Sequence, residues 1–233
     1  MWFFYDYYYL VLVVPALIFA MIASAKVNGT FKKYSTKRTL RGVTGAECAR
    51  MILDKNGLYN VRIERVAGNL SDHYDPRTNV IRLSDSVYSS QSVSAVGVAA
   101  HEAGHAVQYA ENYAPIKFRA AIIPVTNIGS ALALPLILIG LLFPSGFSSL
   151  AYIGVMLFSL TAVFQLVTLP VEFNASRRAI DAMRQSGRFE DAEITASRRV
   201  LSAAAMTYVA ALIVSLAQLL RLVLIVGDSS RRR

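Results

Sequence analysis

Four long apolar segments constrain the fold of this chain more than any other feature of its sequence. They cover about residues 7–25, 122–143, 150–171 and 201–226 of 233. Within a bilayer the backbone finds no water, so a segment of about 20 apolar residues crosses as a helix with internal hydrogen bonds. The hydrophobic content of 55% and the mean hydropathy of +0.43 agree with this class. We therefore expect a mostly α-helical membrane protein with about four apolar spans.

The first apolar segment has two interpretations, a cleaved signal peptide and a permanent anchor. Ala23-Ser24-Ala25 resembles a small-residue cleavage site. A signal peptide begins with a positively charged region, however, and Asp6 is the only charged residue before this segment. We predict an uncleaved anchor, because the preceding aromatic residues suit the interface between membrane and water: Trp2, Phe3, Phe4, Tyr5, Tyr7, Tyr8 and Tyr9.

Most basic residues fall on one side of the predicted spans. Residues 26–119 contain 14 of the 24 Lys and Arg, and residues 172–200 contain six more. Cytoplasmic loops are enriched in Lys and Arg, so both segments are expected in the cytoplasm, with a tight hairpin loop at 144–148 outside. Four full crossings would place the basic tail 231–233 outside too, so the sequence leaves open whether the last segment crosses. Arg221 lies inside that segment, where a charge needs a partner or a route to the interface.

The net charge of +9 does not indicate nucleic-acid binding. The basic residues lie beside apolar segments rather than in a patch interleaved with aromatic residues, so anionic lipid is the simpler partner. The single cysteine, Cys48, excludes an intramolecular disulfide. We therefore expect no nucleic-acid partner and a fold that does not depend on oxidation.

Residues 26–119 combine helix and strand patterns. Thr44-Gly45-Ala46-Glu47 is typical of a capping box and predicts a helix through Leu53. Partial alternation predicts strands over 60–66 and 80–83, with turn residues at 75–79 between them. A run of small and apolar residues then predicts a buried helix.

That buried helix contains the pentapeptide His101-Glu102-Ala103-Gly104-His105. Residues four apart share one helical face, so both imidazoles can point at one metal ion. Glu102 lies one position along and can act as a base on a water without being a ligand, as in zinc peptidases. The alternative is a chance pentapeptide in a core helix, but two of the chain's three histidines fall in it. We predict that His101 and His105 bind Zn²⁺ and that Glu102 is the catalytic base.

A catalytic zinc site needs a third protein ligand. No histidine follows His105, so the candidates are acidic. On a continuous helix Glu111 would point away from the imidazoles, whereas Glu172 lies where the third apolar segment ends and a helix is predicted to begin. Glu172 is therefore the predicted third ligand. The alternative is that the Glu172 carboxylate only reaches the membrane interface and binds no metal. A mixed-charge stretch typical of a solvated helix contains other acids: Asp181, Glu190, Asp191 and Glu193.

Three passages carry a family resemblance: SDHYDP, AAHEAGHAVQ and PVEFNASRRA. Together with the N-terminal anchor and the central hairpin, they resemble the YugP-type bacterial neutral zinc metallopeptidases over nearly the whole chain. The resemblance implies His101 and His105 as ligands and Glu102 as the base. The order of motif, hairpin and Glu-bearing helix is also similar to HtpX-type membrane proteases and the CAAX prenyl proteases.

These more distant relatives carry an Asp four residues after their third-ligand Glu, and that Asp orients a ligand His. This chain has Glu172 but Ser176 at the Asp position, so the Ser176 hydroxyl is the candidate partner of an imidazole N–H.

His73 is a candidate donor to the oxyanion of the reaction. Alternatively, His73 is a turn residue that bonds to Asp75, and we prefer this interpretation.

These observations divide the chain into five parts. Residues 1–25 are an N-terminal membrane anchor, and 26–119 are a small α+β, zincin-like cytoplasmic part. Residues 120–171 form a transmembrane hairpin, 172–200 a cytoplasmic helix with the third zinc ligand, and 201–233 a C-terminal apolar span with a basic tail.

The sequence thus predicts a zinc-dependent endopeptidase of the inner or plasma membrane that hydrolyses protein or peptide substrates at the cytoplasmic surface. The resemblance implies a role in membrane-protein quality control. One alternative is a zinc-binding membrane scaffold without turnover, but a structural zinc site has no use for the base Glu102. The other is a CAAX-type prenyl protease with a lipid chamber. The sequence decides neither the natural substrate nor whether a scaffold partner or a homo-oligomer is involved.

Overall fold

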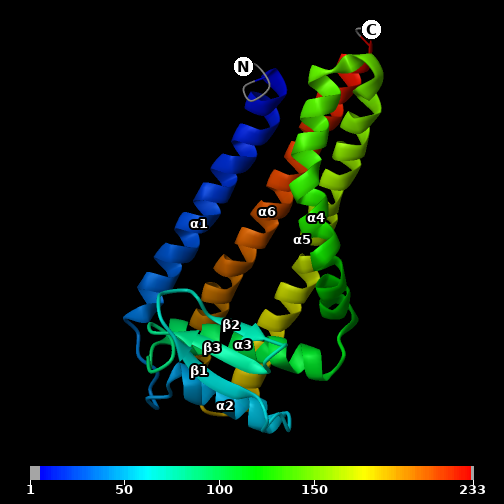
Figure 1. Cartoon of the computed structure of the whole chain (residues 1–233). Helices are drawn as coiled ribbons and strands as arrows, with labels where there is room; N and C mark the ends of the chain where they lie inside the picture. Colours follow the sequence, from blue (N-terminus) through cyan, green and yellow to red (C-terminus); the bar gives the residue numbers. More distant parts are fainter. Residues whose placement is uncertain (1–5, 232–233) are drawn as a thin grey trace. The chain divides into compact units, whose positions relative to one another are not determined.

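The computed structural model describes residues 6–231 and is mostly helical, with four long apolar helices and one small sheet (Figure 1). This confirms the predicted fold class. The elements in chain order are η1 (Tyr9–Val13), α1 (Val14–Ser35), α2 (Gly45–Lys55), β1 (Arg62–Val66), β2 (His73–Asp75), β3 (Val80–Ser84), α3 (Val93–Ala110), α4 (Ala114–Leu142), α5 (Pro144–Gln185) and α6 (Asp191–Arg231).

The chain forms two compact units, each assembled from distant segments. The first unit contains the chain up to Ala23, Phe118–Leu169 and the chain from Thr207 onward. The second contains Ser24–Lys117 and Pro170–Met206. The second unit therefore joins the H-E-x-x-H helix to the part of α5 that carries Glu172.

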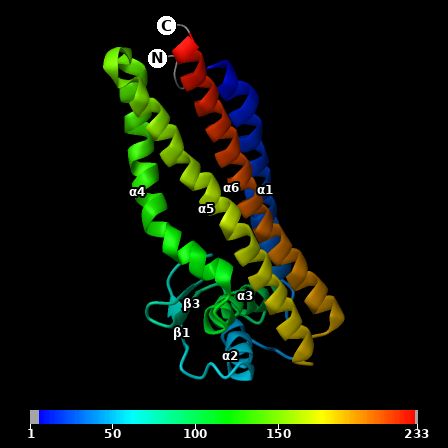
Figure 2. The ribbon, with the colours of Figure 1, turned by 90° about the vertical axis from the view of Figure 1, so that its right-hand side faces the viewer.

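Each predicted apolar segment corresponds, to within two residues at its ends, to part of a helix that is long and apolar enough to cross a membrane. These helices extend over Tyr9–Ser35, Ala114–Leu142, Ser148–Gln185 and Asp191–Ser229. Each is longer than its apolar segment, since helical geometry continues into the flanking polar residues (Figure 2).

Two predicted helix boundaries differ from the structure. The predicted loop at 144–148 is wrong, because α4 ends at Leu142 and α5 begins at Pro144. Proline suits the first helical turn, where its missing N–H would have no partner within the helix. The helix expected to begin near Glu172 is likewise wrong, because α5 continues from Pro144 to Gln185. The third span and the Glu172 helix are therefore one helix.

In the first unit, the start of the chain packs against the end of α6. Arg221 is only 2% exposed, and its Nε and Nη2 donate to Asp6 Oδ2 at 3.0 and 2.7 Å. The Tyr9 ring centroid lies 5.3 Å from the guanidinium carbon, and the Tyr8 hydroxyl donates to Asp228 at 2.7 Å. Arg221 thus has the partner that a charge in an apolar segment requires. The beginning of the first candidate span and the end of the last lie at the same end of this unit (Figure 1).

The sheet of the second unit has the order β1-β3-β2, with β1 parallel and β2 antiparallel to β3. The central strand β3 is the most buried, since Val80, Ile81 and Leu83 are not exposed at all. Strands β1 and β3 confirm the predicted strands. Strand β2 is not predicted, because a three-residue segment of His, Tyr and Asp shows no apolar alternation.

Helices α2 and α3 pack against each other beside this sheet (Figure 1). The predicted capping box of α2 is confirmed: Thr44 N–H donates to Glu47 Oε2 at 2.8 Å, and Glu47 N–H donates to Thr44 Oγ1 at 3.2 Å. One apolar core joins both helices to the sheet and to α5, and includes Cys48, Leu53, Leu83, Val96, Ala103 and Met183. This core fixes the positions of α3 and α5, on which the functional site is built.

Candidate metal centre

The H-E-x-x-H sequence lies in the middle of α3, on the predicted helix. The Ser92 side chain caps this helix by accepting from Ala95 N–H at 3.3 Å. The four-residue spacing places the His101 and His105 rings edge to face, with centroids 4.7 Å apart. Helix α3 therefore presents both imidazoles on one face.

Glu172 of α5 meets both imidazoles. Its Oε2 lies 3.2 Å from His101 Nε2 and 3.5 Å from His105 Nε2. Glu172 is only 2% exposed, so its carboxylate is almost completely removed from water. Among the described residues, the cluster that could hold a metal ion is His101, His105 and Glu172, whose ligand atoms lie within 4.8 Å of one another.

The cluster fits zinc in both chemistry and size. Tetrahedral zinc with bonds of about 2.0–2.1 Å has neighbouring ligand atoms about 3.3–3.4 Å apart. The two distances from Glu172, 3.2 and 3.5 Å, lie on either side of that value. Two imidazole nitrogens and one carboxylate oxygen are a catalytic ligand set, which leaves one coordination position open.

Each imidazole is oriented through its other nitrogen. His101 Nδ1 lies 3.1 Å from Ser176 Oγ, and His105 Nδ1 lies 3.0 Å from Gln108 Oε1. Gln108 Nε2 must donate to the Val171 carbonyl at 2.8 Å, so the amide oxygen faces His105 and can only accept. When His105 is neutral, it therefore carries its proton on Nδ1 and leaves the Nε2 lone pair free to bind a metal.

Gln108 begins a polar network that links α3 to α5. It is fully buried, and its Nε2 also donates to Asn174 Oδ1 at 2.9 Å. Arg178 Nε donates to the same Asn174 oxygen at 2.7 Å, and Arg178 pairs with Glu111 at 2.7 Å. Gln108 and Asn174 were not predicted from the sequence, although a Gln three residues after His105 lies on the same face of the helix as that imidazole.

The charges around His105 favour its protonated form. Burial disfavours that form, but the hydrogen bond with Glu172 and the charges of Glu102 and Glu172 outweigh burial and raise the pKa of His105. A metal ion competes with this proton, so its binding weakens as the pH falls.

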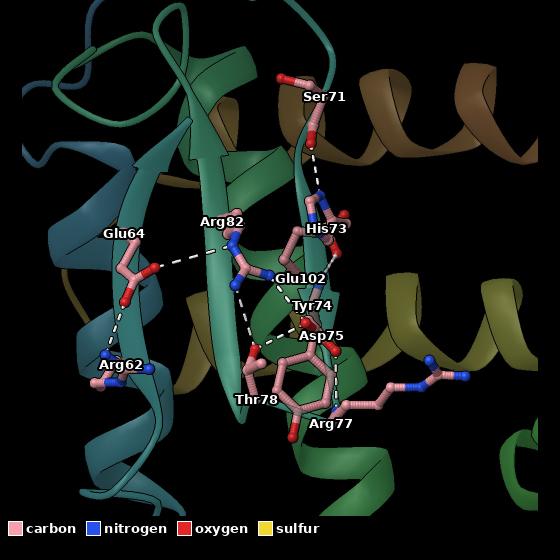
Figure 3. A network of polar contacts seen from close by, with 10 residues as sticks. All are labelled: Arg62, Glu64, Ser71, His73, Tyr74, Asp75, Arg77, Thr78, Arg82 and Glu102. Carbon is pink, nitrogen blue, oxygen red and sulfur yellow. Dashed lines mark hydrogen bonds and ion pairs between the residues drawn. The ribbon is translucent and has the colours of Figure 1, made fainter. Parts of the chain in front are cut away.

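Glu102 lies beside the cluster and is held by the sheet. Its Oε2 accepts the backbone N–H of Tyr74 in β2 at 3.0 Å (Figure 3). Glu102 is 8% exposed. A backbone N–H thus fixes one carboxylate oxygen, next to the two imidazoles but outside their ligand set.

His73 lies outside the cluster, exposed on β2. The expected bond to Asp75 is wrong: His73 Nδ1 contacts the Ser71 carbonyl at 2.8 Å instead (Figure 3). Asp75 accepts from Thr78, Arg82 and the Arg77 N–H, which together hold the pKa of Asp75 well below its usual range. These contacts tie β2 to β3 and so support the Tyr74 backbone that holds Glu102.

The other acidic candidates have partners elsewhere. Glu111, just past the end of α3, is exposed and pairs with Arg178. Asp181 is exposed and lies 3.9 Å from Arg184. Glu193 differs from its expected solvated state, since it is buried and accepts from the Leu40 N–H at 2.8 Å.

The chain matches a family model described as "Putative neutral zinc metallopeptidase" over residues 9–227. The chain belongs to this family. It is also similar to a protein of Bacillus subtilis (strain 168) described as "Putative membrane protease YugP", with 48% identity over 217 residues, 93% of this chain and 96% of that protein. No solved structure matches the chain significantly.

Membership of the zinc metallopeptidase family confirms the resemblance read from the three motifs. It also agrees with the donor set found in the structure, two His and one Glu. The chain is therefore a membrane zinc metallopeptidase.

This zinc metallopeptidase depends on a close approach between α3 and α5. A Cβ atom added at Gly104 would lie 2.7 Å from the Ala175 carbonyl oxygen, closer than real Cβ contacts. Glu172 and Ser176 are the α5 residues on either side of this contact. The side chains of Glu172 and Ser176 contact the imidazoles only because Gly104, which has no Cβ atom, lets α3 and α5 approach so closely.

We expect Gly104→Ala to weaken zinc binding by at least the roughly 10–100-fold typical of a lost supporting contact. The added methyl group pushes α5 away, because the Ala175 backbone cannot rotate aside. Zinc titration of the detergent-purified protein measures the effect. Gly29→Ala is the matched control, since a Cβ there has nothing within 4 Å. Equal zinc affinity in the two variants would contradict the expectation.

Proposed function

We propose that this chain is an endopeptidase in which His101, His105 and Glu172 hold the zinc and Glu102 is the general base. One observation carries the proposal: a buried carboxylate from α5 meets two imidazoles from α3, and a second carboxylate lies beside them outside the ligand set. A site that served only to hold a metal would not need that second carboxylate. A membrane scaffold without turnover is the less favoured alternative for this reason.

The residues of the site divide the chemistry among them. Bound zinc supplies a Lewis acid that polarises the scissile carbonyl and acidifies a water. Glu102 accepts the proton of the attacking water on its carboxylate and passes it to the nitrogen of the leaving amine. The Tyr74 N–H holds one oxygen of that carboxylate, so the other is presented to the water. General base and acid assistance of this type contributes about 10²–10⁴-fold to the rate.

An extended peptide is the substrate conformation that the site favours. Strand β2 ends the sheet on one side, and its Tyr74 N–H points to Glu102. A strand at the edge of a sheet can pair with another extended chain through its outward backbone groups; because the Tyr74 N–H donates to Glu102, a substrate would pair with the Tyr74 carbonyl. A substrate aligned beside β2 would place a peptide bond close to Glu102. Unfolded segments meet this requirement, which supports a role in membrane-protein quality control.

The cytoplasmic surface of the membrane is the proposed location of the site. Glu172 directly follows the apolar segment 150–171, and the remainder of α5 contains the other charged residues of this helix. Residues 26–119 and 172–200 together carry 20 of the 24 Lys and Arg, which favours the cytoplasmic side for both.

We expect Glu102→Gln to fold and retain zinc but lose about 10²–10⁴-fold of its peptidase activity. The amide oxygen can still accept the Tyr74 N–H, but it cannot take a proton. Zinc content and cleavage of an unfolded protein substrate are measured together. Glu190→Gln, which neutralises an exposed acid, is the control and stays active. If Glu102→Gln is as active as wild type on the same substrate, the mechanism is wrong.

For the third ligand, we expect Glu172→Ala to weaken zinc binding by more than about 100-fold, since a ligand atom is lost. Ser176→Ala removes only an imidazole partner and should cost about 10–100-fold. Glu111→Ala and Asp181→Ala leave the affinity unchanged. Zinc titration in detergent compares the four variants. Wild-type affinity in Glu172→Ala, with a loss in Glu111→Ala or Asp181→Ala, would assign the ligand to another residue.

For sidedness, we expect an impermeant maleimide to label Ser149→Cys in intact cells and to label Ser35→Cys only after permeabilisation. The native Cys48 gives little background, because it is fully buried and burial raises the pKa of its thiol to about 12. A Cys48→Ser background checks this. Rapid labelling of Ser35→Cys in intact cells would reverse the orientation.

A further inference from the structure

An open pocket of about 900 Å³ lies among α1, α5 and α6 in the second unit, and we name it the three-helix pocket. Its polar part is lined by Lys26 and Lys33 of α1, Arg177 of α5, and Arg198 and Arg199 of α6. Its apolar part is lined by residues such as Phe173, Leu201 and Met206. The pocket therefore joins a strongly basic region to an apolar one.

The positive charge of the three-helix pocket is not balanced within the protein. Its one acidic lining residue, Asp181, already lies 3.9 Å from Arg184. Arg199 donates to the Tyr34 hydroxyl at 3.2 Å, and this uncharged partner does not balance the charge of Arg199. Within residues 6–231, Lys26, Arg177 and Arg198 form no ion pair. Uncompensated basic side chains around a pocket attract an anion.

The basic residues also lie at the ends of three apolar segments. Lys26 directly follows the segment 7–25, Arg177 follows 150–171 by six residues, and Arg199 precedes 201–226 by two. Basic residues in such positions lie at the depth of the lipid headgroups. Basic pockets between membrane helices bind anionic headgroups, because phosphate pairs with Lys and Arg.

We propose that the three-helix pocket binds an anionic phospholipid. Its phosphate pairs with Lys26, Arg177 and Arg198, and an acyl chain lies against the apolar lining near Leu201 and Met206. Free phosphate could bind the same basic side chains, because it carries the same anionic group as the lipid. Only a lipid would also contact the apolar lining.

A bound lipid would also contact the helix that completes the metal centre. Ser176 lines the three-helix pocket, and its Oγ lies 3.1 Å from His101 Nδ1. The lipid therefore holds α5 next to the residue that orients a zinc ligand. The binding proposal itself does not depend on peptidase activity.

The test is native mass spectrometry of the full-length protein in detergent, titrated with phosphatidylglycerol and with phosphatidylcholine. We expect wild type to retain phosphatidylglycerol preferentially. The double variant Arg177→Gln/Arg198→Gln should bind it about 30-fold more weakly, from the contribution of each basic residue near anionic lipid. Arg62→Gln/Arg77→Gln removes the same charge from the exposed sheet region and should bind like wild type.

Three results would overturn the proposal. One is equal retention of phosphatidylglycerol and phosphatidylcholine by wild type. Another is displacement of phosphatidylglycerol by inorganic phosphate at a similar concentration, since the pocket would then bind the free anion. The last is unchanged lipid binding in Arg177→Gln/Arg198→Gln. Circular dichroism checks the fold, and Lys26→Gln/Lys33→Gln provides a second pair with the same expected loss if the first pair fails to fold.

Discussion

The crossing of α3 and α5 at Gly104 and Ala175 is the contact on which the functional structure depends. Only a glycine allows the Ala175 carbonyl so close to α3. The contact brings Glu172 and Ser176 within reach of the two imidazoles, and Gln108 reinforces it by donating to the α5 backbone and to Asn174. A buried amide with every polar atom bonded resists displacement, because any shift leaves an unpaired group in an apolar core.

This arrangement divides one metal site between two segments that are 67 positions apart. The intervening residues form α4 and most of the apolar part of α5, so they supply membrane helices rather than ligands. Zinc binding would join α3 to α5, and the free energy of metal binding then also stabilises the fold. Helix α5 is continuous from Pro144 to Gln185, with Pro170 two residues before Glu172.

Features that depend on local pattern could be predicted from the sequence. The four apolar helices, the capping box at Thr44 and the pairing of His101 with His105 each follow from spacing within one segment. Glu172 was chosen by elimination among the acidic residues; the structure places its carboxylate beside both imidazoles, and its role as a ligand stays a prediction. Contacts that exist only after folding could not be predicted: strand β2 requires pairing with β3, Gln108 finds Asn174 through the helix crossing, and Arg221 finds Asp6 from the other end of the chain.

Serine at position 176 has an electrostatic consequence for the metal centre. Glu102 and Glu172 already place two carboxylates beside the site of a dication. An Asp at position 176 could orient His101 through the same nitrogen but would add a third negative charge to a partly buried site, where charges interact more strongly than in water. The Ser176 hydroxyl orients the same imidazole nitrogen at 3.1 Å without that charge. A zinc ion held by His101, His105 and Glu172 would then meet less negative charge and would polarise a carbonyl more strongly.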